Sequence, residues 1–238
     1  MKLYIYKTEN EVAVGLSKYI KDNFLKNEVV NIALSGGNTP KLLYQVISNS
    51  YKDENWNKVH FFWVDERCVP KTDDDSNYKL AKNYLFDSIK INKNNINEID
   101  GTNNPKKEAL SYSNQLMNKI NMNNNFPSFD LIILGLGDDG HTASIFPNQM
   151  KTLDTNNCCE VALHPISNQK RITLTKNTIN NAKNIVFHVT GKNKSSVVDK
   201  LINKLGKYKN YPAHYIKPNN GNLSWFLDFS AASKINKI

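Results

Sequence analysis

The segment VVNIALSGGNTP, residues 29–40, decides the fold that we predict for this chain. Its first half, Val29–Leu34, is a mostly apolar run with the length and composition of a buried strand. Its second half, residues 35–40, is rich in turn-forming residues and ends in a proline that is well placed to open a helix. A buried strand followed by a polar turn recurs at Val59–Val64 and again at Leu131–Leu134.

Strand-like and helix-like segments alternate along the rest of the chain. Further strands are predicted at Leu3–Tyr6, Glu160–Leu163, Arg171–Leu174, Ile185–Thr190 and Leu223–Leu227. Amphipathic helices are predicted from a Thr8 cap to Phe24, over Pro40–Ser48, from Ser76 or Asn77 to Ile89, over Pro105–Ile120 and over Lys194–Leu205. Repeated strand-then-helix units predict an α/β fold. We expect a doubly wound, mostly parallel, Rossmann-like sheet with helices on both faces, as a single domain over residues 1–238.

The composition argues against several classes of protein. The 238 residues carry a net charge of +9, with 29 Lys against 2 Arg. The lysines are scattered among asparagines and form no stripe interleaved with aromatic residues, so we expect no nucleic-acid binding. No apolar run approaches the roughly 18 residues that span a bilayer, and the N-terminus lacks a signal-peptide pattern. We therefore expect a cytoplasmic protein without membrane contact, and the spacing of the three cysteines predicts neither a disulfide framework nor a metal site.

The polar turns after three predicted strands are expected to meet in one crevice, because ligands of open α/β sheets bind beyond the carboxyl ends of the strands. In the first turn, two glycines allow backbone N–H groups to approach an oxyanion at a helix N-terminus, which is the geometry of a phosphate cradle. A tight Gly-Gly turn with Ser or Thr as the helix cap fits equally well. The candidate phosphate-binding residues are Ser35, Gly36, Gly37, Asn38 and Thr39.

The two arginines are candidate anion contacts. In a chain that otherwise uses lysine, Arg67 and Arg171 are expected where a planar, bidentate guanidinium is required. Asp65 or Glu66 could orient Arg67 toward a phosphate or a carbonyl oxygen, although such a cluster is often only a structural ion pair. Lys194 follows a later strand and could supply a further cation, but a solvated lysine fits that position as well.

The third turn contains the candidate base. Residues 135–140 match GxGxxG, but two carboxylates stand where a pyrophosphate would lie, so we reject dinucleotide binding. His141 follows directly on this strand-end loop, where an imidazole could take a proton from water as a general base. The other four histidines are interpreted as structural; they are His60, His164, His188 and His214.

Taken together, these motifs resemble those of the 6-phosphogluconolactonases. The matching segments, in chain order, are LSGGNTP at 34–40, WVDERCVP at 63–70, SNY at 76–78, DLIILGLGDDGHTASIFP at 130–147, RITLT at 171–175, Gly191-x-x-Lys194 and LSWFLD at 223–228. The resemblance implies hydrolysis of 6-phospho-D-glucono-1,5-lactone, a step of the pentose phosphate pathway, with no required cofactor or metal. The implied partner is this small sugar-phosphate lactone, and we expect a monomer.

A lactonase site needs a base for water, a cation for the developing oxyanion and an anchor for the remote phosphate. We assign His141 as the base and Arg67 as the oxyanion or phosphate contact. The anchor is assigned to the backbone of residues 35–39 with Arg171 and Lys194. Asp139 either orients His141 or serves only as a turn residue.

Two other functions remain open at this stage. A glucosamine-6-phosphate deaminase shares the implied fold. Its strand-end motif resembles Asp-Glu-Tyr, whereas this chain has Arg67 at the position of the tyrosine. The deaminase also carries an acidic residue at the position of Phe146 in this chain. A non-catalytic sugar-phosphate sensor would keep the anion cradle but would not need His141.

Overall fold

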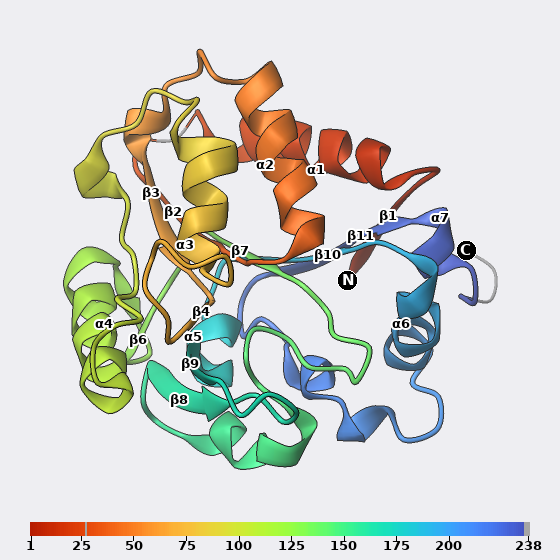
Figure 1. Cartoon of the computed structure of the whole chain (residues 1–238). Helices are drawn as coiled ribbons and strands as arrows, with labels where there is room; N and C mark the ends of the chain where they lie inside the picture. The colour runs from red at the N-terminus through yellow and green to blue at the C-terminus, as the bar shows by residue number, and fades with distance from the viewer. Residues whose placement is uncertain (27, 236–238) are drawn as a thin grey trace.

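Six parallel strands form the central sheet of the computed structural model, in the order β1-β11-β10-β7-β2-β3 (Figure 1). The structure describes residues 1–26 and 28–235, without the side chains of residues 151–154. The strands are β1 (Lys2–Tyr6), β2 (Val30–Leu34), β3 (Val59–Trp63), β7 (Leu131–Leu134), β10 (Asn184–Val189) and β11 (Asn222–Asp228). This sheet confirms the predicted fold class, and β1 lies at one edge.

Helices cover both faces of this sheet, with α1, α2 and α3 on one side and α5 on the other (Figure 1). The α-helices are α1 (Glu9–Phe24), α2 (Asn38–Ser50), α3 (Asn77–Ala81), α4 (Pro105–Lys119), α5 (Lys176–Asn180), α6 (Ser195–Ile202) and α7 (Phe229–Ala232). Other helical segments, which are 3-10 or π-helical, are η1 (Trp56–Lys58), η2 (Lys82–Phe86), η3 (Lys93–Asn95), η4 (Pro147–Asp154), η5 (Lys192–Lys194), η6 (Tyr208–Asn210) and η7 (Pro212–Tyr215). In the part of the chain that is described, no helix is long and apolar enough to cross a membrane.

Local capping explains where several helices begin. The Thr8 side chain accepts a hydrogen bond from the Glu11 N–H, which confirms the predicted start of α1. Ser76 caps α3 in the same way. The helix predicted over residues 76–89 is α-helical only to Ala81 and continues as a π-helical turn, η2.

A second, antiparallel sheet corrects the predicted strand arrangement. It consists of β4 (Asp65–Arg67), β9 (Lys170–Leu174) and β8 (Cys159–Leu163), in the order β4-β9-β8. The strands expected near residues 160 and 171 therefore exist but do not join the parallel sheet. Residues 65–67, expected as a loop after β3, instead extend the chain into this smaller sheet. A hairpin of β5 (Met122–Asn123) and β6 (Phe126–Pro127) completes the strands.

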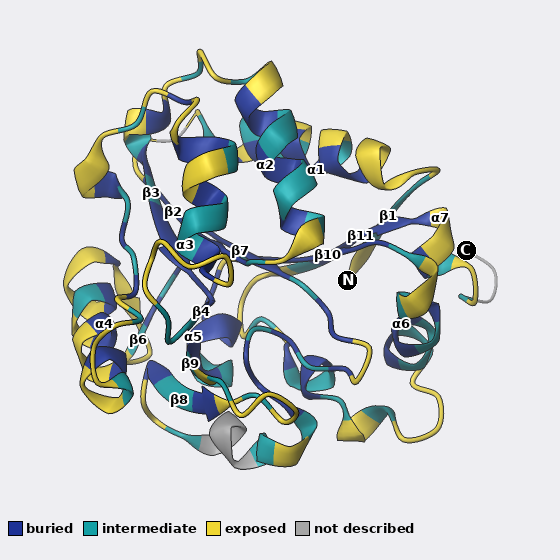
Figure 2. Cartoon of the chain, viewed as in Figure 1, coloured by how far each residue is buried: buried dark blue, intermediate teal, exposed yellow. Residues whose placement is uncertain are grey.

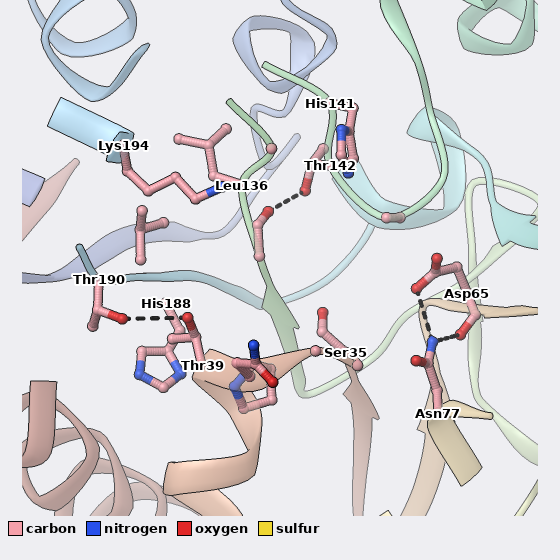
Figure 3. Close-up of a pocket in the computed structure, with 18 of the residues that line it drawn as sticks. Ser35, Thr39, Asp65, Asn77, Leu136, His141, Thr142, His188, Thr190 and Lys194 are labelled. Carbon is pink, nitrogen blue, oxygen red and sulfur yellow. Dashed lines mark hydrogen bonds between the residues drawn. The ribbon is translucent and has the colours of Figure 1, made fainter. Parts of the chain in front are cut away.

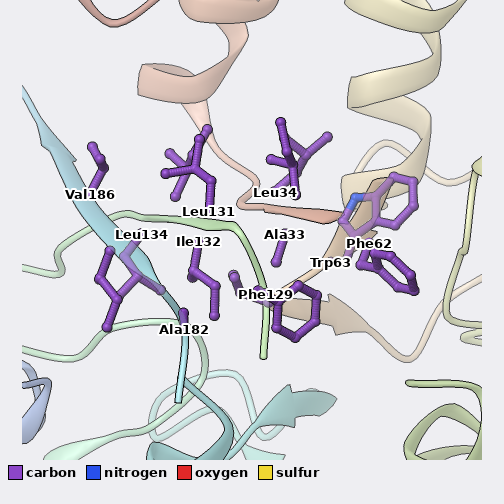
Figure 4. Packing of buried hydrophobic residues seen from close by; sticks show 14 of the residues in the cluster. Ala33, Leu34, Phe62, Trp63, Phe129, Leu131, Ile132, Leu134, Ala182 and Val186 are labelled. Atoms are coloured by element: carbon purple, nitrogen blue, oxygen red, sulfur yellow. The ribbon is translucent and has the colours of Figure 1, made fainter. Parts of the chain in front are cut away.

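The core lies on both faces of the central strands (Figure 2). Every residue of β2 and β7 is buried, as expected for parallel strands covered by other elements on both sides. Figure 4 shows Leu34, Trp63 and Leu134 packed in this layer. The Phe62 and Phe129 rings meet edge to face, with their centroids 5.5 Å apart. The single-domain extent over residues 1–238 stays a prediction.

The strand order places a switch point between β2 and β7. From β2 the chain goes to its neighbour β3, whereas from β7 the sheet grows the other way, through β10 to β11. Loops that leave two such strands in opposite directions open a crevice at their carboxyl ends. The loops in question are residues 35–37 and 135–141.

Candidate active site

A cleft of about 220 Å³ lies at this switch point (Figure 3). The structure brings together nearly all of the candidate residues predicted from the sequence. Those that line the cleft are Ser35, Gly36, Gly37, Asn38, Thr39, Arg67, His141, Arg171 and Lys194. Asp139 does not line the cleft, but it contacts a residue that does.

The loop before α2 offers backbone donors to the cleft. Gly37 has φ +99°, a conformation that favours glycine, and no side chain caps the helix that follows. The start of α2 also lies at Asn38 rather than at the predicted Pro40. A Cβ atom at Gly36 would overlap the side chain of Asn77. The uncapped N-terminus of this 13-residue helix, without an acidic residue in its first turn, is suited to an anion.

The side chains of Ser35 and Thr39 are engaged elsewhere. The Ser35 hydroxyl donates to the Ile133 carbonyl at 2.7 Å and so ties β2 to β7. Thr39 Oγ1 lies 3.2 Å from Thr190 Oγ1 across the cleft wall (Figure 3). An anion would therefore meet the backbone groups of this loop and the exposed Asn38 first.

The two arginines lie side by side. Arg67 on β4 pairs in register with Arg171 on β9, so both side chains project from the same face of the small sheet. The Nε atom of each guanidinium is buried and has no partner among the described residues. Burial lowers the pKa of Arg171, and the charge of Arg67 adds to this effect while Asp65 opposes it. Two adjacent cations with free donors favour an anionic group between them.

The carboxylates near Arg67 have other roles than the one we predicted. Glu66 accepts hydrogen bonds from the backbone N–H groups of Arg67, Asn77 and Tyr78, and thereby fixes the start of α3. Burial raises the pKa of Glu66, although these hydrogen bonds oppose the shift. Asp65 accepts from the Ser144 hydroxyl at 2.6 Å and faces Arg171 at 4.0 Å. The prediction that Asp65 or Glu66 orients the Arg67 guanidinium is therefore wrong.

His141 is held by Asp139. The distance from His141 Nδ1 to Asp139 Oδ1 is 2.6 Å, and the same oxygen accepts from the His141 backbone N–H at 3.0 Å. Partial burial raises the pKa of Asp139, but the hydrogen bonds and charge of His141 outweigh it, so this pKa lies below its usual value. An ionised Asp139 favours the tautomer with the proton on Nδ1, which leaves the lone pair on Nε2. Asp139 therefore both shapes the turn and contacts the imidazole.

Lys194 reaches the cleft from the segment after β10 (Figure 3). Its ammonium forms an ion pair with Asp138, whose carboxylate also accepts a hydrogen bond from the Asn193 side chain. An incoming anion would share Lys194 with Asp138.

Asn77 and His188 are among the residues of the cleft wall that were not predicted from the sequence as candidates. Asn77 donates to the Asp65 carbonyl at 2.8 Å, while its side-chain oxygen is buried without a partner among the described residues. His188 had been interpreted only as structural, yet it lines the cleft beside Thr39 and Thr190 (Figure 3). Its place near the carboxyl end of β10 was the signal that could have revealed it.

The burial of His188 predicts an acid-sensitive stability. Its side chain is buried, its Nδ1 has no partner within the described residues, and burial lowers its pKa to about 3. Between about pH 6.5 and the folded pKa only the unfolded state binds this proton, so stability falls with acidification by up to about 1.4 kcal/mol per pH unit. Denaturant unfolding at pH 7 and pH 5 should show this loss, and His188→Leu should remove that part of it. An equal loss in both proteins would contradict the prediction.

No group of three or more His, Cys, Asp or Glu residues in the described ranges is placed to hold a metal ion.

The comparisons with known proteins bear directly on this site. The family model described as glucosamine-6-phosphate isomerases/6-phosphogluconolactonase matches residues 7–225, a range that includes all three strand-end loops and both arginines. The chain belongs to this family. A 6-phosphogluconolactonase of Haemophilus influenzae is 42% identical over 86% of this chain and 87% of that protein. One from Treponema pallidum is 35% identical over 83% of each chain.

A solved structure in this family has the same architecture. The 6-phosphogluconolactonase of Trypanosoma brucei superposes with a TM-score of 0.87 at 27% identity, covering 99% of this chain and 98% of that one. These relatives agree with the resemblance found in the sequence motifs.

Proposed function

We propose that this chain hydrolyses 6-phospho-D-glucono-1,5-lactone to 6-phospho-D-gluconate. The observation that carries the proposal is that His141, oriented by Asp139, opens on the same cleft as Arg67, Arg171 and an uncapped helix N-terminus. The relatives named as 6-phosphogluconolactonases support this substrate over that of a deaminase. A cytoplasmic location and a monomeric state stay predictions.

His141 would act through Nε2. It accepts a proton from a water molecule as the water oxygen forms a bond to C1 of the lactone, and the carbonyl oxygen becomes an oxyanion. Arg67 would stabilise that oxyanion with its guanidinium N–H groups. The bond from C1 to the ring oxygen then breaks, and the proton held by His141 passes to that oxygen. The product is an open chain with a hydroxyl and a carboxylic acid, which ionises in water.

The phosphate would be anchored away from the reacting carbonyl. Backbone N–H groups at the start of α2, together with Lys194 and Arg171, supply the positive potential. Binding energy from this remote group fixes the lactone carbonyl relative to His141.

The direct test follows loss of the lactone. The lactone is generated from glucose 6-phosphate by an added dehydrogenase, and its decay is recorded with and without the protein against the spontaneous background. Acceleration in proportion to protein concentration supports the proposal. An unaccelerated decay would contradict it, and ammonia release from glucosamine 6-phosphate, or binding of 6-phosphogluconate alone, would then favour the deaminase or the sensor.

The arginines should not tolerate lysine. A lysine keeps the charge but cannot present two donors in a plane, so Arg67→Lys and Arg171→Lys should each lower kcat/KM roughly tenfold or more. For Arg171→Lys we expect the effect chiefly in KM, because we assign this residue to the anchor. Steady-state kinetics on the lactone measure both values. Parental kinetics in both variants would show that bidentate geometry is not needed.

A further inference from the structure

The paired arginines are oriented by neutral oxygens rather than by carboxylates. Arg67 Nη1 donates to the backbone carbonyl of Asp75 at 2.5 Å. Arg171 Nη2 donates to the side-chain carbonyl of Gln169 at 3.3 Å. Among the described residues, the carboxylate that contacts either guanidinium is that of Asp65, at 4.0 Å from Arg171. A neutral acceptor fixes the direction of a guanidinium without cancelling its charge.

Gln169 connects the two arginine contacts. Its Nε2 donates to Asp75 Oδ2 at 2.9 Å, while its Oε1 accepts from Arg171. Asp75 in turn presents its backbone carbonyl to Arg67. One amide side chain therefore joins β9 to the loop before α3, 94 residues away in sequence, and closes a ring of contacts around the arginine pair.

These contacts also offset the electrostatic repulsion between the two arginines. Two guanidinium groups that project from neighbouring strands repel each other, and like charges directly opposite on a sheet are destabilising. Without Gln169, Arg171 would lose a hydrogen bond but keep its 4.0 Å contact with Asp65, and Arg67 would lose the contact that holds the Asp75 side chain in place. Gln169 can serve both sides because an amide carries a donor and an acceptor, whereas a carboxylate would face Asp75 with like charge.

We propose that Gln169 is a positioning residue, which holds Arg67 and Arg171 side by side through uncharged contacts so that each keeps its charge for its own part of the substrate, Arg67 for the oxyanion and Arg171 for the phosphate. The inference rests on the proposed function for its kinetic consequence. The geometry itself predicts an effect on anion binding whether or not the lactone is the substrate.

The test compares three variants of the full chain. Gln169→Leu removes both contacts at similar volume, and Gln169→Glu keeps an acceptor for Arg171 but adds a charge that neutralises it and repels Asp75. Gln115→Leu is the matched control, because Gln115 lies on α4 and contacts Asn97 outside the cleft. The measurements are kcat and KM on the lactone, the dissociation constant for 6-phosphogluconate by calorimetry, and the midpoint of thermal unfolding.

For Gln169→Leu we expect KM and the dissociation constant to rise about tenfold, the cost of one lost hydrogen bond to a charged group, with kcat changed much less. The Gln169→Glu variant should bind 6-phosphogluconate more weakly than Gln169→Leu does. Its carboxylate neutralises the charge of Arg171, and it also loses the contact with Asp75. Combining Gln169→Glu with Asp75→Asn exchanges amide and carboxylate, and should recover part of the affinity lost in Gln169→Glu.

Three results would overturn the inference. They are binding by Gln169→Leu equal to that of Gln115→Leu, a loss confined to thermal stability, or tighter binding by Gln169→Glu than by the parent. Absence of lactone hydrolysis in the parent would count against the proposed function alone. The dissociation constants for 6-phosphogluconate, measured by calorimetry, would still test whether Gln169 positions the arginines.

Discussion

His141→Ala should lower kcat for lactone hydrolysis by about 10²–10⁴-fold, the usual contribution of a positioned general base. The imidazole is the group on its loop that can accept a proton from water near neutral pH, and its Nδ1 is already engaged by Asp139. Binding of 6-phosphogluconate should stay close to that of the parent, because the anchor residues belong to other elements. Single-turnover kinetics and calorimetry measure the two quantities separately.

The matched control is His164→Ala. His164 lies close to the same aromatic ring as His141, with centroid distances to Phe146 of 5.4 Å and 4.9 Å. It hydrogen-bonds Ser167 on the hairpin loop between β8 and β9 and is not among the residues lining the cleft. Its loss should leave kcat nearly unchanged. A parental kcat in His141→Ala, or equal losses in both variants, would remove His141 from the reaction.

The strand-end loops could be predicted because their signals are local. Val30–Leu34 and Leu131–Leu134 are mostly apolar runs, the first followed by Ser-Gly-Gly and the second by Gly135, and a parallel sheet forces the carboxyl ends of neighbouring strands to one edge. The convergence of His141 with the loop before α2 follows from these two facts. It also requires that β2 and β7 are neighbours in the sheet, which the pairing of Ile32 with Leu131 establishes in the structure.

The smaller sheet could not be predicted in the same way. β4 has only three residues, Asp65–Arg67, all charged, and such a segment carries no strand signal of its own. It becomes a strand because β9 pairs with it from more than 100 positions away, as Asp65 lies opposite Thr173. Strand propensity and hydrophobic periodicity depend on residues that are close in sequence, so neither indicates a pairing with a distant strand.

The same limit explains why Glu66 does not orient Arg67. Adjacent residues on a strand point to opposite faces, so Glu66 cannot share a face with Arg67 once residues 65–67 are extended. Glu66 turns instead to the N–H groups at the start of α3. The prediction assumed a loop at this point, in which neighbouring side chains could meet.

Gly137→Ala should lower kcat by about 100-fold, because displacement of a catalytic group by about 1 Å is enough for a loss of that size. A Cβ atom at Gly137 would overlap the imidazole of His141 and the carboxylate of Asp139. The turn cannot move away easily, since the Gly137 N–H donates to the His141 carbonyl at 2.8 Å and its carbonyl accepts from Gly140 at 3.0 Å. The added methyl group must therefore push His141 and Asp139 apart, or rotate the imidazole away from the orientation in which Asp139 holds it.

Gly135→Ala on the same loop is the control for this prediction. A Cβ atom there would meet no protein atom within 4 Å, and its backbone is outside the region that disfavours side chains. It should leave the contact between His141 and Asp139 intact, although KM can change because Gly135 lines the cleft. The NMR chemical shifts of the His141 ring should change in Gly137→Ala and stay at the parental values in Gly135→Ala. If both variants keep the parental kcat, the close packing around Gly137 does not hold the base in place, and the role of Asp139 reduces to that of a turn residue.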